Sequence, residues 1–274
     1  MTLLKDKLVL VTGGASGIGR KMGCMALERG ARLLIWDKDK ERGGKTRKEL
    51  SAFGEVYFYN VDVSSPSDVK YSAKLVKQKF GGIDVLINNA GVVTGKYFHQ
   101  HTREEIEKTI NVNTTASMYV TREFLSGMIE NNEGHICNIS SMAGLIGNPR
   151  MPVYVASKWA LVGWSDTLRL EMRKLAKNVK VTTVTPFYID TGMFAGVRTF
   201  YPVLKPEGVA RKVIRAIERN RILVSMPWSV RFVRFCQGIM PIRFFDWFMG
   251  DVLRVYQTMD HFQGRDKSVK NGGT

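Results

Sequence analysis

The sequence predicts an α/β fold in which helices cover both faces of one parallel β-sheet. Short β-branched or aliphatic runs alternate with amphipathic stretches along most of the chain, and this alternation is typical of repeated βαβ units. A glycine-rich turn joins the first apolar run to the first amphipathic stretch, as expected where a buried strand passes directly into a helix. The 274 residues, 44% of them hydrophobic, suffice for a single core. We therefore expect one domain with a doubly wound sheet of about seven strands.

Seven apolar runs predict the strands, and the stretches between them predict the helices. The strands are expected over residues 7–12, 32–36, 56–60, 85–88, 135–140, 179–185 and 222–224. The helices are expected over residues 17–29, 39–51, 66–79, 103–130, 152–176 and 206–219. Pro66, Pro152 and Pro206 stand near three of the helix starts, where the missing N–H of a proline costs no hydrogen bond.

The part of the chain after the last strand differs from the rest in composition. Residues 1–226 contain all the predicted strands, and residues 227–262 read as an amphipathic helical extension of the same domain. Residues 263–274 are polar and end in glycine, which predicts a flexible tail. We find neither the pattern of a signal peptide nor an apolar run of about 18 residues that could cross a bilayer.

Charge and cysteine usage narrow the functional classes. The formal net charge of +16 means that the surface attracts anions, such as dinucleotide phosphates, acidic lipid headgroups or nucleic acid. We do not expect nucleic-acid binding, because no helix-turn-helix pattern or aromatic and basic RNA-binding signature accompanies the charge. Cys24, Cys137 and Cys236 are widely separated, which predicts neither a disulfide framework nor a CxxC site and favours the cytoplasm.

The glycine-rich turn has the form TGGASGIG over residues 12–19. Glycines at 13, 17 and 19 remove side chains that would keep a diphosphate away from the backbone amides, and the following helix directs its positive end at the phosphates. With Ser16 and Ile18, these glycines predict a dinucleotide site in a Rossmann-type domain formed by residues 1–226.

Acidic and amide residues after the next strands extend this cofactor site. Asp37 ends the second strand about twenty residues on, where its carboxylate would bind ribose hydroxyls and repel a 2′-phosphate. This predicts NAD rather than NADP, although the neighbouring Lys38 and Arg42 oppose that preference. Further cofactor contacts are expected from Asp62, Val63, Asn89, Ala90 and Gly91.

Tyr154 and Lys158 are four residues apart in the stretch YVASK, so on a helix they share one face. A tyrosine that acts as a base near neutral pH must lower its pKa from about 10 to about 7, which requires roughly 4 kcal/mol. One cation about 4 Å away supplies a comparable amount at an effective dielectric constant near 20. We therefore expect Lys158 to activate Tyr154.

These motifs together resemble the short-chain dehydrogenase/reductase family over about residues 5–225. The resemblance rests on TGGASGIG, NNAG, YVASK, Asn113 and Ser141. It implies that Asn113, Ser141, Tyr154 and Lys158 form a catalytic tetrad. Ser141 has the interval to the tyrosine that the family shows, whereas Ser140 would point to the opposite side of its strand.

The resemblance also implies a role for each residue. Tyr154 would take the hydroxyl proton of an alcohol while hydride passes to the nicotinamide, and Ser141 would hold the substrate oxygen. Lys158 would also bind the nicotinamide ribose, and Asn113 would fix a water molecule. Contacts with the nicotinamide are expected from Ile189 and Thr191, although Phe187 stands where the family usually has glycine.

The stretch after residue 185 is similar to the retinol and hydroxysteroid dehydrogenase branch of that family, through PF and DTGMF. A lid over residues 193–204 and the loop after Ser141 are rich in apolar side chains, which predicts a lipophilic alcohol such as a retinoid, steroid or long-chain alcohol. The substrate contacts are expected from Ser141, Leu145, Met151, Tyr188, Met193 and Phe194. The alternatives are an NADPH-preferring carbonyl reductase and a catalytically idle dinucleotide-binding scaffold at membranes.

The C-terminal extension and the partners leave several alternatives open. Residues 227–262 interleave aromatic side chains with arginines, so this segment could contact an anionic membrane or lipid droplet, roof the substrate pocket or form a homodimer. The family resemblance implies a homodimer or homotetramer through the helices at 103–130 and 152–176. His99 and His101 lack a third ligand nearby in sequence, so no metal is expected.

Overall fold

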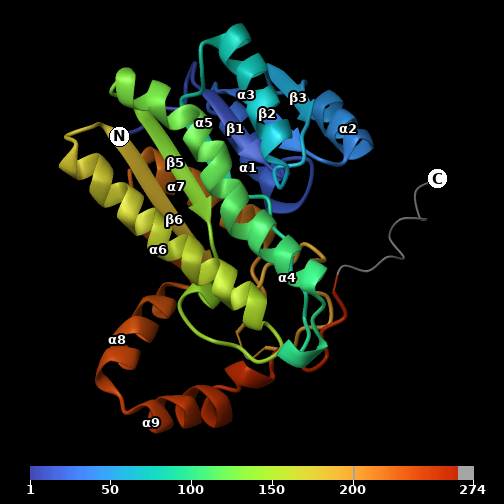
Figure 1. Ribbon diagram of the computed structural model, residues 1–274, viewed down its shortest axis with the longest axis vertical. Coiled ribbons are helices and arrows are strands. Elements are labelled where there is room, and N and C mark those ends of the chain that lie inside the picture. Colours follow the sequence, from blue (N-terminus) through green and yellow to red (C-terminus); the bar gives the residue numbers. More distant parts are fainter. Residues whose placement is uncertain (200, 265–274) are drawn as a thin grey trace.

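The computed structural model describes residues 1–199 and 201–264, and within them it shows one parallel sheet (Figure 1). The strands are β1 (Leu8–Thr12), β2 (Arg32–Asp37), β3 (Val56–Asn60), β4 (Val85–Asn88), β5 (Gly134–Ile139), β6 (Val179–Pro186) and β7 (Leu223–Met226). Their spatial order is β3-β2-β1-β4-β5-β6-β7, and every pair is parallel. The predicted doubly wound sheet is confirmed.

Helices cover both faces of this sheet because its strands are buried on both sides. One face packs against α1 (Gly17–Leu27), α2 (Lys40–Leu50) and α7 (Pro206–Glu218). The other packs against α3 (Pro66–Phe80), α5 (Ala116–Glu130) and α6 (Pro152–Lys174) (Figure 1). In β1, Val9 and Val11 enter the first core while Leu8 and Leu10 enter the second, as the period of two along a strand requires.

Capping residues set where several helices begin and end. Asp39 accepts a hydrogen bond from the backbone N–H of Arg42 at the start of α2. At the start of α3, the Ser65 side chain accepts a hydrogen bond from the backbone N–H of Asp68, and Pro66 follows in the first turn. Gly81 caps the end of this helix in a left-handed backbone conformation, which glycine adopts readily.

The predicted helix over residues 103–130 is wrong as one continuous element. The structure has α4 (Arg103–Ile110) and α5, joined by a π-helical turn, Asn111–Thr115. A π turn inserts one extra residue and redirects the side chains within it, and Asn113, which lies in this turn, is fully buried. The other predicted bounds agree with the observed ones within two residues.

The C-terminal extension forms α8 (Arg231–Ile239) and α9 (Ile242–Trp247), followed by short helical turns up to Gln257. In Figure 1 both helices lie beyond the carboxyl end of the sheet, at the bottom of the view. None of the helices in the described part of the chain combines the length and apolar character needed to cross a membrane. Of the predicted flexible tail, residues 265–274 lie outside the described residues.

Candidate functional site

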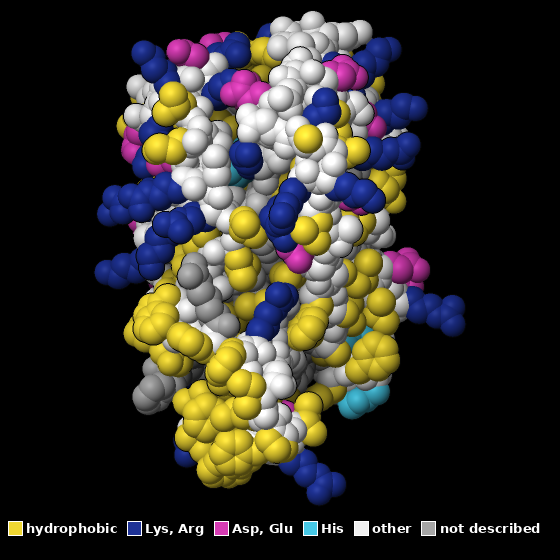
Figure 2. Space-filling view, turned by 90° about the vertical axis from the view of Figure 1, so that its left-hand side faces the viewer, with side chains coloured by type: hydrophobic (Ala, Val, Ile, Leu, Met, Phe, Trp, Pro, Cys, Tyr) yellow, Lys and Arg dark blue, Asp and Glu magenta, His cyan; other side chains and the backbone are white. Residues whose placement is uncertain are grey.

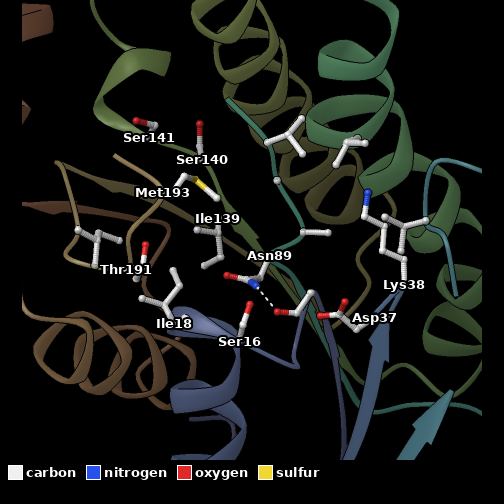
Figure 3. A pocket seen from close by; sticks show the side chains of 18 of the residues that line it. Ser16, Ile18, Asp37, Lys38, Asn89, Ile139, Ser140, Ser141, Thr191 and Met193 are labelled. Carbon is white, nitrogen blue, oxygen red and sulfur yellow. Dashed lines mark hydrogen bonds between the residues drawn. The ribbon is translucent and has the colours of Figure 1, made fainter. Parts of the chain in front are cut away.

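A cavity of about 310 Å³ opens at the carboxyl end of the sheet. Its lining comes from the turns after β1, β2, β3 and β4, from the end of β5, from α6 and from the segment after β6. The strand order reverses between β1 and β4, and ligands of doubly wound sheets bind at such a reversal. Figure 3 shows Asp37 and Lys38 at one end of this cavity, Ser140 and Ser141 toward the other, and Asn89 and Ser16 between them.

The glycine-rich turn forms a cradle that larger residues would fill. Gly13 has a left-handed backbone (φ 64°), and a Cβ there would lie 3.0 Å from the Ala90 Cα. Gly19 does not line the cavity, and its direct contact with the cofactor stays a prediction. A Cβ at Gly19 would instead lie 2.4 Å from the Gly13 carbonyl oxygen. Gly19 therefore lets α1 approach the turn that faces the cofactor.

The other residues predicted for the cofactor are brought together by the fold. The cavity is lined by Gly13, Ser16, Gly17, Ile18, Asp37, Asp62, Val63, Asn89, Ala90, Gly91, Tyr154, Lys158, Ile189 and Thr191. Asn89 fixes the glycine turn, because its side-chain amide donates to the carbonyl oxygens of Thr12 (3.0 Å) and Gly13 (3.2 Å). These donor groups and the cradle fit a nicotinamide dinucleotide, with the turn at its diphosphate and Asp37 at its adenosine ribose.

The Asp37 carboxylate is held in place by backbone groups. Its two oxygens accept hydrogen bonds from the N–H groups of Ala15 (3.0 Å) and Asp39 (3.1 Å). Lys38 and Arg42 line the same end of the cavity, and Arg42 forms an ion pair with Asp39 at 3.5 Å. This end therefore presents the carboxylates of Asp37, Asp39 and Asp62 together with two cations.

Tyr154 and Lys158 lie on α6 with their side chains buried in the cavity wall. The Lys158 ammonium donates to the Ile139 carbonyl oxygen at 2.9 Å and lies 5.7 Å from the centre of the Tyr154 ring. Burial raises the pKa of Tyr154 to about 12, partly offset by a hydrogen bond with Ser141, and burial lowers the pKa of Lys158 to about 8.

Burial of both groups opposes the expected activation of Tyr154 by Lys158. Both groups lose hydration on burial, and desolvation penalises the charged form of each. The Lys158 ammonium also forms its hydrogen bond with a backbone carbonyl and not with the phenol. Positive charge from a bound oxidised nicotinamide would act in the same direction as Lys158 and favour the deprotonated phenol.

The two neighbouring serines have different surroundings. Ser141 interacts with Tyr154 and accepts a hydrogen bond from the Ala143 N–H at 3.1 Å. Ser140 donates instead to the Lys158 carbonyl oxygen at 3.0 Å, within α6. Ser141 is thus the serine beside the phenol.

Asn113 is used to fix the backbone beside the cavity. Its Oδ1 accepts from the Val92 N–H at 2.8 Å, and its Nδ2 donates to the Val92 carbonyl (2.9 Å) and to Ser157 Oγ (3.0 Å). Both amide hydrogens are therefore engaged. These contacts position the Val92 backbone, and the binding of a water molecule by an acceptor of Asn113 stays a prediction.

Aromatic and aliphatic side chains form the other end of the site. Met193 and Phe194 line the main cavity, while Met151 and Tyr188 line an adjoining cavity of about 30 Å³. The Phe194 ring makes edge contacts with the rings of both Tyr154 and Tyr188. Leu145 lines neither cavity, so its prediction as a substrate contact is wrong. It is 1% exposed and packs behind the wall.

The C-terminal extension covers this apolar end. Its buried side chains form one cluster with Tyr154, Tyr188 and Met151. They are Val230, Val233, Phe245, Met249, Val255 and Met259. Arg150 ties the extension to the loop after β5 by donating to the carbonyl oxygens of Met259 and Asp260. Residues 227–262 therefore pack over the apolar end of the pocket, which was one of the three roles considered for this segment.

Metal chemistry has no counterpart in this arrangement. Within residues 1–199 and 201–264, we find no group of three histidine, cysteine, aspartate or glutamate side chains that could hold a metal ion. The site therefore offers a phenol, a hydroxyl and an ammonium as its reactive groups.

Comparison with known proteins decides the family. Residues 7–202 match the short chain dehydrogenase family. The chain belongs to this family. Epidermal retinol dehydrogenase 2 of Mus musculus is 37% identical over 96% of this chain and 87% of its own length. Estradiol 17-beta-dehydrogenase 11 of Homo sapiens is 34% identical over 87% of this chain and 80% of its own.

A solved structure shows the same fold with a nicotinamide cofactor. A short-chain dehydrogenase/reductase from Burkholderia phymatum in complex with NAD superposes with a TM-score of 0.80 at 26% identity, covering 87% of this chain and 95% of that one. Similar solved structures contain NAD or NADP. This short-chain dehydrogenase is therefore an oxidoreductase that interconverts an alcohol and its carbonyl compound with a nicotinamide dinucleotide, and the predicted resemblance to the retinol and hydroxysteroid branch is confirmed.

Proposed function

We propose that this protein oxidises a lipophilic alcohol, or reduces the corresponding aldehyde or ketone, with NAD as the preferred cofactor. The observation that carries the proposal is one continuous cavity with two unlike ends. Its polar end contains the glycine turn and Asp37, and its apolar end contains Phe187, Met193 and Phe194. Apolar walls of this kind suit a retinoid, a steroid or a long-chain alcohol better than a sugar or hydroxy acid. The names of the retinol and estradiol dehydrogenase relatives point in the same direction.

The residues between the two ends supply the proton chemistry. Tyr154 takes the hydroxyl proton during oxidation and returns it during reduction, while Ser141 holds the substrate oxygen beside the phenol. Lys158 adds positive charge to the same wall. When bound, an oxidised nicotinamide accepts the hydride and brings further positive charge into the cavity. That charge would favour the deprotonated form of Tyr154, whose pKa burial raises.

The preference for NAD rests on Asp37. Its carboxylate is fixed by two backbone N–H groups at the adenosine end of the cavity. A fixed carboxylate can accept hydrogen bonds from ribose hydroxyls and repels a 2′-phosphate. Lys38 and Arg42 reduce this repulsion, and the Arg42–Asp39 ion pair limits how far Arg42 contributes.

The test is a substrate panel measured with both cofactors. Retinoids, steroid alcohols and long-chain alcohols are incubated with NAD or NADP, and nicotinamide absorbance is followed. We expect turnover of at least one apolar alcohol, with kcat/KM higher for NAD. Tight NAD binding without turnover of any substrate, in either direction, would support the idle scaffold instead. Higher kcat/KM with NADPH would support the carbonyl reductase.

We also propose that the outer face of α8 and α9 contacts an anionic membrane, as a peripheral protein of the cytoplasm. Large apolar side chains that are about half exposed or more gather on this segment, namely Trp228, Phe232, Phe235, Ile239, Ile242, Phe244 and Trp247. Figure 2 shows hydrophobic side chains concentrated at the lower end, where these helices lie, and Lys and Arg side chains over the body above. Arg234 and Arg243 are exposed on the same helices. Aromatic side chains beside arginines suit a membrane interface.

Sedimentation with vesicles tests this surface. We expect the full chain to bind phosphatidylcholine vesicles that contain phosphatidylserine, and the variant Phe232→Ser with Phe235→Ser to bind at least fivefold less. Tyr71→Ala is the matched control, because Tyr71 is 65% exposed but lies on α3. Absence of binding by the unchanged chain contradicts the membrane proposal. If the double variant changes the sedimentation coefficient without lipid, the face is the predicted homo-oligomer interface.

A further inference from the structure

A small second cavity continues the site away from the cofactor. It measures about 30 Å³ and shares Ser141, Phe187 and Phe194 with the main cavity. Its far wall contains Tyr188 and Asn148. This volume exceeds the roughly 10–15 Å³ that one water molecule needs, so a polar group of a ligand can enter it.

Asn148 and Tyr188 line this cavity, and Thr258, which does not line it, forms hydrogen bonds with both of them. Asn148 Nδ2 donates to Tyr188 Oη (3.2 Å) and to Thr258 Oγ1 (3.0 Å), and the two hydroxyl oxygens lie 2.9 Å apart. Tyr188 and Thr258 are only 7% and 3% exposed. Of these three residues, only Tyr188 is predicted from the sequence as a substrate contact, because neither Asn148 nor Thr258 belongs to a recognisable motif. Their proximity depends on the C-terminal segment folding back over the loop after β5.

The hydrogen bonds within this cluster leave acceptors free. Thr258 donates to the Val255 carbonyl at 2.8 Å, so its oxygen accepts from Asn148 and from Tyr188. The Tyr188 hydrogen is used in that contact, which leaves one lone pair on Tyr188 Oη. Asn148 Oδ1 is buried and has no hydrogen-bond partner in the described part of the chain. The cluster therefore lacks a donor and not an acceptor.

The remaining lining of the small cavity is apolar, with Ile146, Met151 and Val255 beside the shared aromatic residues. A buried acceptor without a donor destabilises the folded protein, and a ligand that supplies the donor removes this penalty. Burial raises the pKa of Tyr188 to about 12, which keeps this side chain a neutral phenol across the working pH range.

We propose that Asn148, Tyr188 and Thr258 form a second polar subsite that binds a hydroxyl group of the substrate remote from the reacting carbon. The proposal rests on the proposed function and narrows its substrate class to apolar molecules with two oxygens, of which the distal one is a hydroxyl. Phe194 contacts the rings of both Tyr154 and Tyr188, so this side chain has to turn aside for a substrate that spans the two sites.

The experiment compares rigid polycyclic diols with the matching mono-alcohols in the variant Tyr188→Phe, which removes one acceptor and keeps the ring. The diols cover several separations between their hydroxyls. We expect the unchanged protein to prefer at least one diol by tenfold or more in kcat/KM. Tyr188→Phe should lose that preference, because its kcat/KM should fall at least tenfold more for the diol than for the mono-alcohol. Tyr256→Phe is the matched control, since Tyr256 lies in the same segment but bonds to Asp246.

The outcomes separate the subsite from the proposed function. An equal loss for diol and mono-alcohol in Tyr188→Phe overturns the subsite in favour of a structural role, and so does an unchanged diol preference. Calorimetric binding of the same compounds to the cofactor-loaded protein gives a readout independent of turnover. If no alcohol is turned over, the proposed reaction fails, while a diol affinity that Tyr188→Phe removes still supports the subsite.

Discussion

The two ends of the cavity are built in different ways. The cofactor end comes mostly from short turns that follow β1, β2, β3 and β4, so most of its residues fall within the first 91 positions of the chain. The substrate end is assembled from the loop after β5, the segment after β6 and the C-terminal extension, which are far apart in sequence. Local sequence therefore determines the first end, and tertiary contacts determine the second. We therefore expect that substitutions at the substrate end can alter substrate preference and leave the glycine turn that binds the cofactor unchanged.

The largest effect is expected at the junction of the two ends, from Lys158→Met. Turnover should fall about 10³-fold, since the only buried ammonium beside Tyr154 in the described chain is lost. Thermal stability at pH 7 should rise, because burial lowers the Lys158 pKa to about 8 and the protonated form is disfavoured in the folded state. Nicotinamide absorbance and thermal unfolding measure the two effects.

The sign of the pH dependence provides the control for this variant. The unfolded chain holds a lysine proton up to pH 10.5, whereas the folded protein releases it near pH 8. The penalty, on the order of 3 kcal/mol, is therefore fully present below pH 8 and disappears as pH rises toward 10.5. The stability gain of Lys158→Met should shrink accordingly. A gain that does not change between pH 7 and pH 10 would contradict the assigned cause.

Gly19→Ala breaks the cofactor end alone. The new Cβ would lie 2.4 Å from the Gly13 carbonyl and displace the turn, so NAD affinity measured by calorimetry should fall at least tenfold. Gly44→Ala is the matched control, because Gly44 lies in α2 and a Cβ there meets nothing within 4 Å. That control should keep NAD affinity and gain about 0.4–1 kcal/mol of stability. Equal NAD affinity in both variants would refute the cradle.

Asp37→Asn should give the smallest effect and sharpen the comparison. Removing the carboxylate charge lowers the repulsion of a 2′-phosphate, so the NAD-to-NADP ratio of kcat/KM should shift about tenfold toward NADP. The ranking of alcohol substrates should stay the same, since Asp37 lies at the other end of the cavity. A changed substrate ranking would show that the two ends are not independent.

The same difference explains how far sequence carried the prediction. The strands, the glycine turn and Asp37 follow from periodicity and spacing, because strand and turn residues act locally. The π turn around Asn113 could not be foreseen, since its helical pattern continues on both sides. It depends on hydrogen bonds between the Asn113 side chain and Val92, 21 residues away.

The errors at the substrate end have a common physical origin. Leu145 was expected in the pocket because it is apolar and follows Ser141, yet packing behind the wall buries it. Asn148 and Thr258 lie 110 residues apart and meet only through the folded C-terminal segment. The extent to which burial raises the Tyr154 pKa depends on packing in three dimensions, which spacing alone does not reveal.

The most direct test is the single-turnover rate of alcohol oxidation by cofactor-loaded protein between pH 6 and pH 11, in the unchanged chain and in Tyr154→Phe. We expect the rate of the unchanged protein to rise with pH to a plateau, because the phenol must lose its proton before it can take one from the substrate. In Tyr154→Phe the rate should be about 10³-fold lower and lose this pH dependence, with NAD affinity unchanged. The same rate and pH profile in both proteins would show that Tyr154 is not the base.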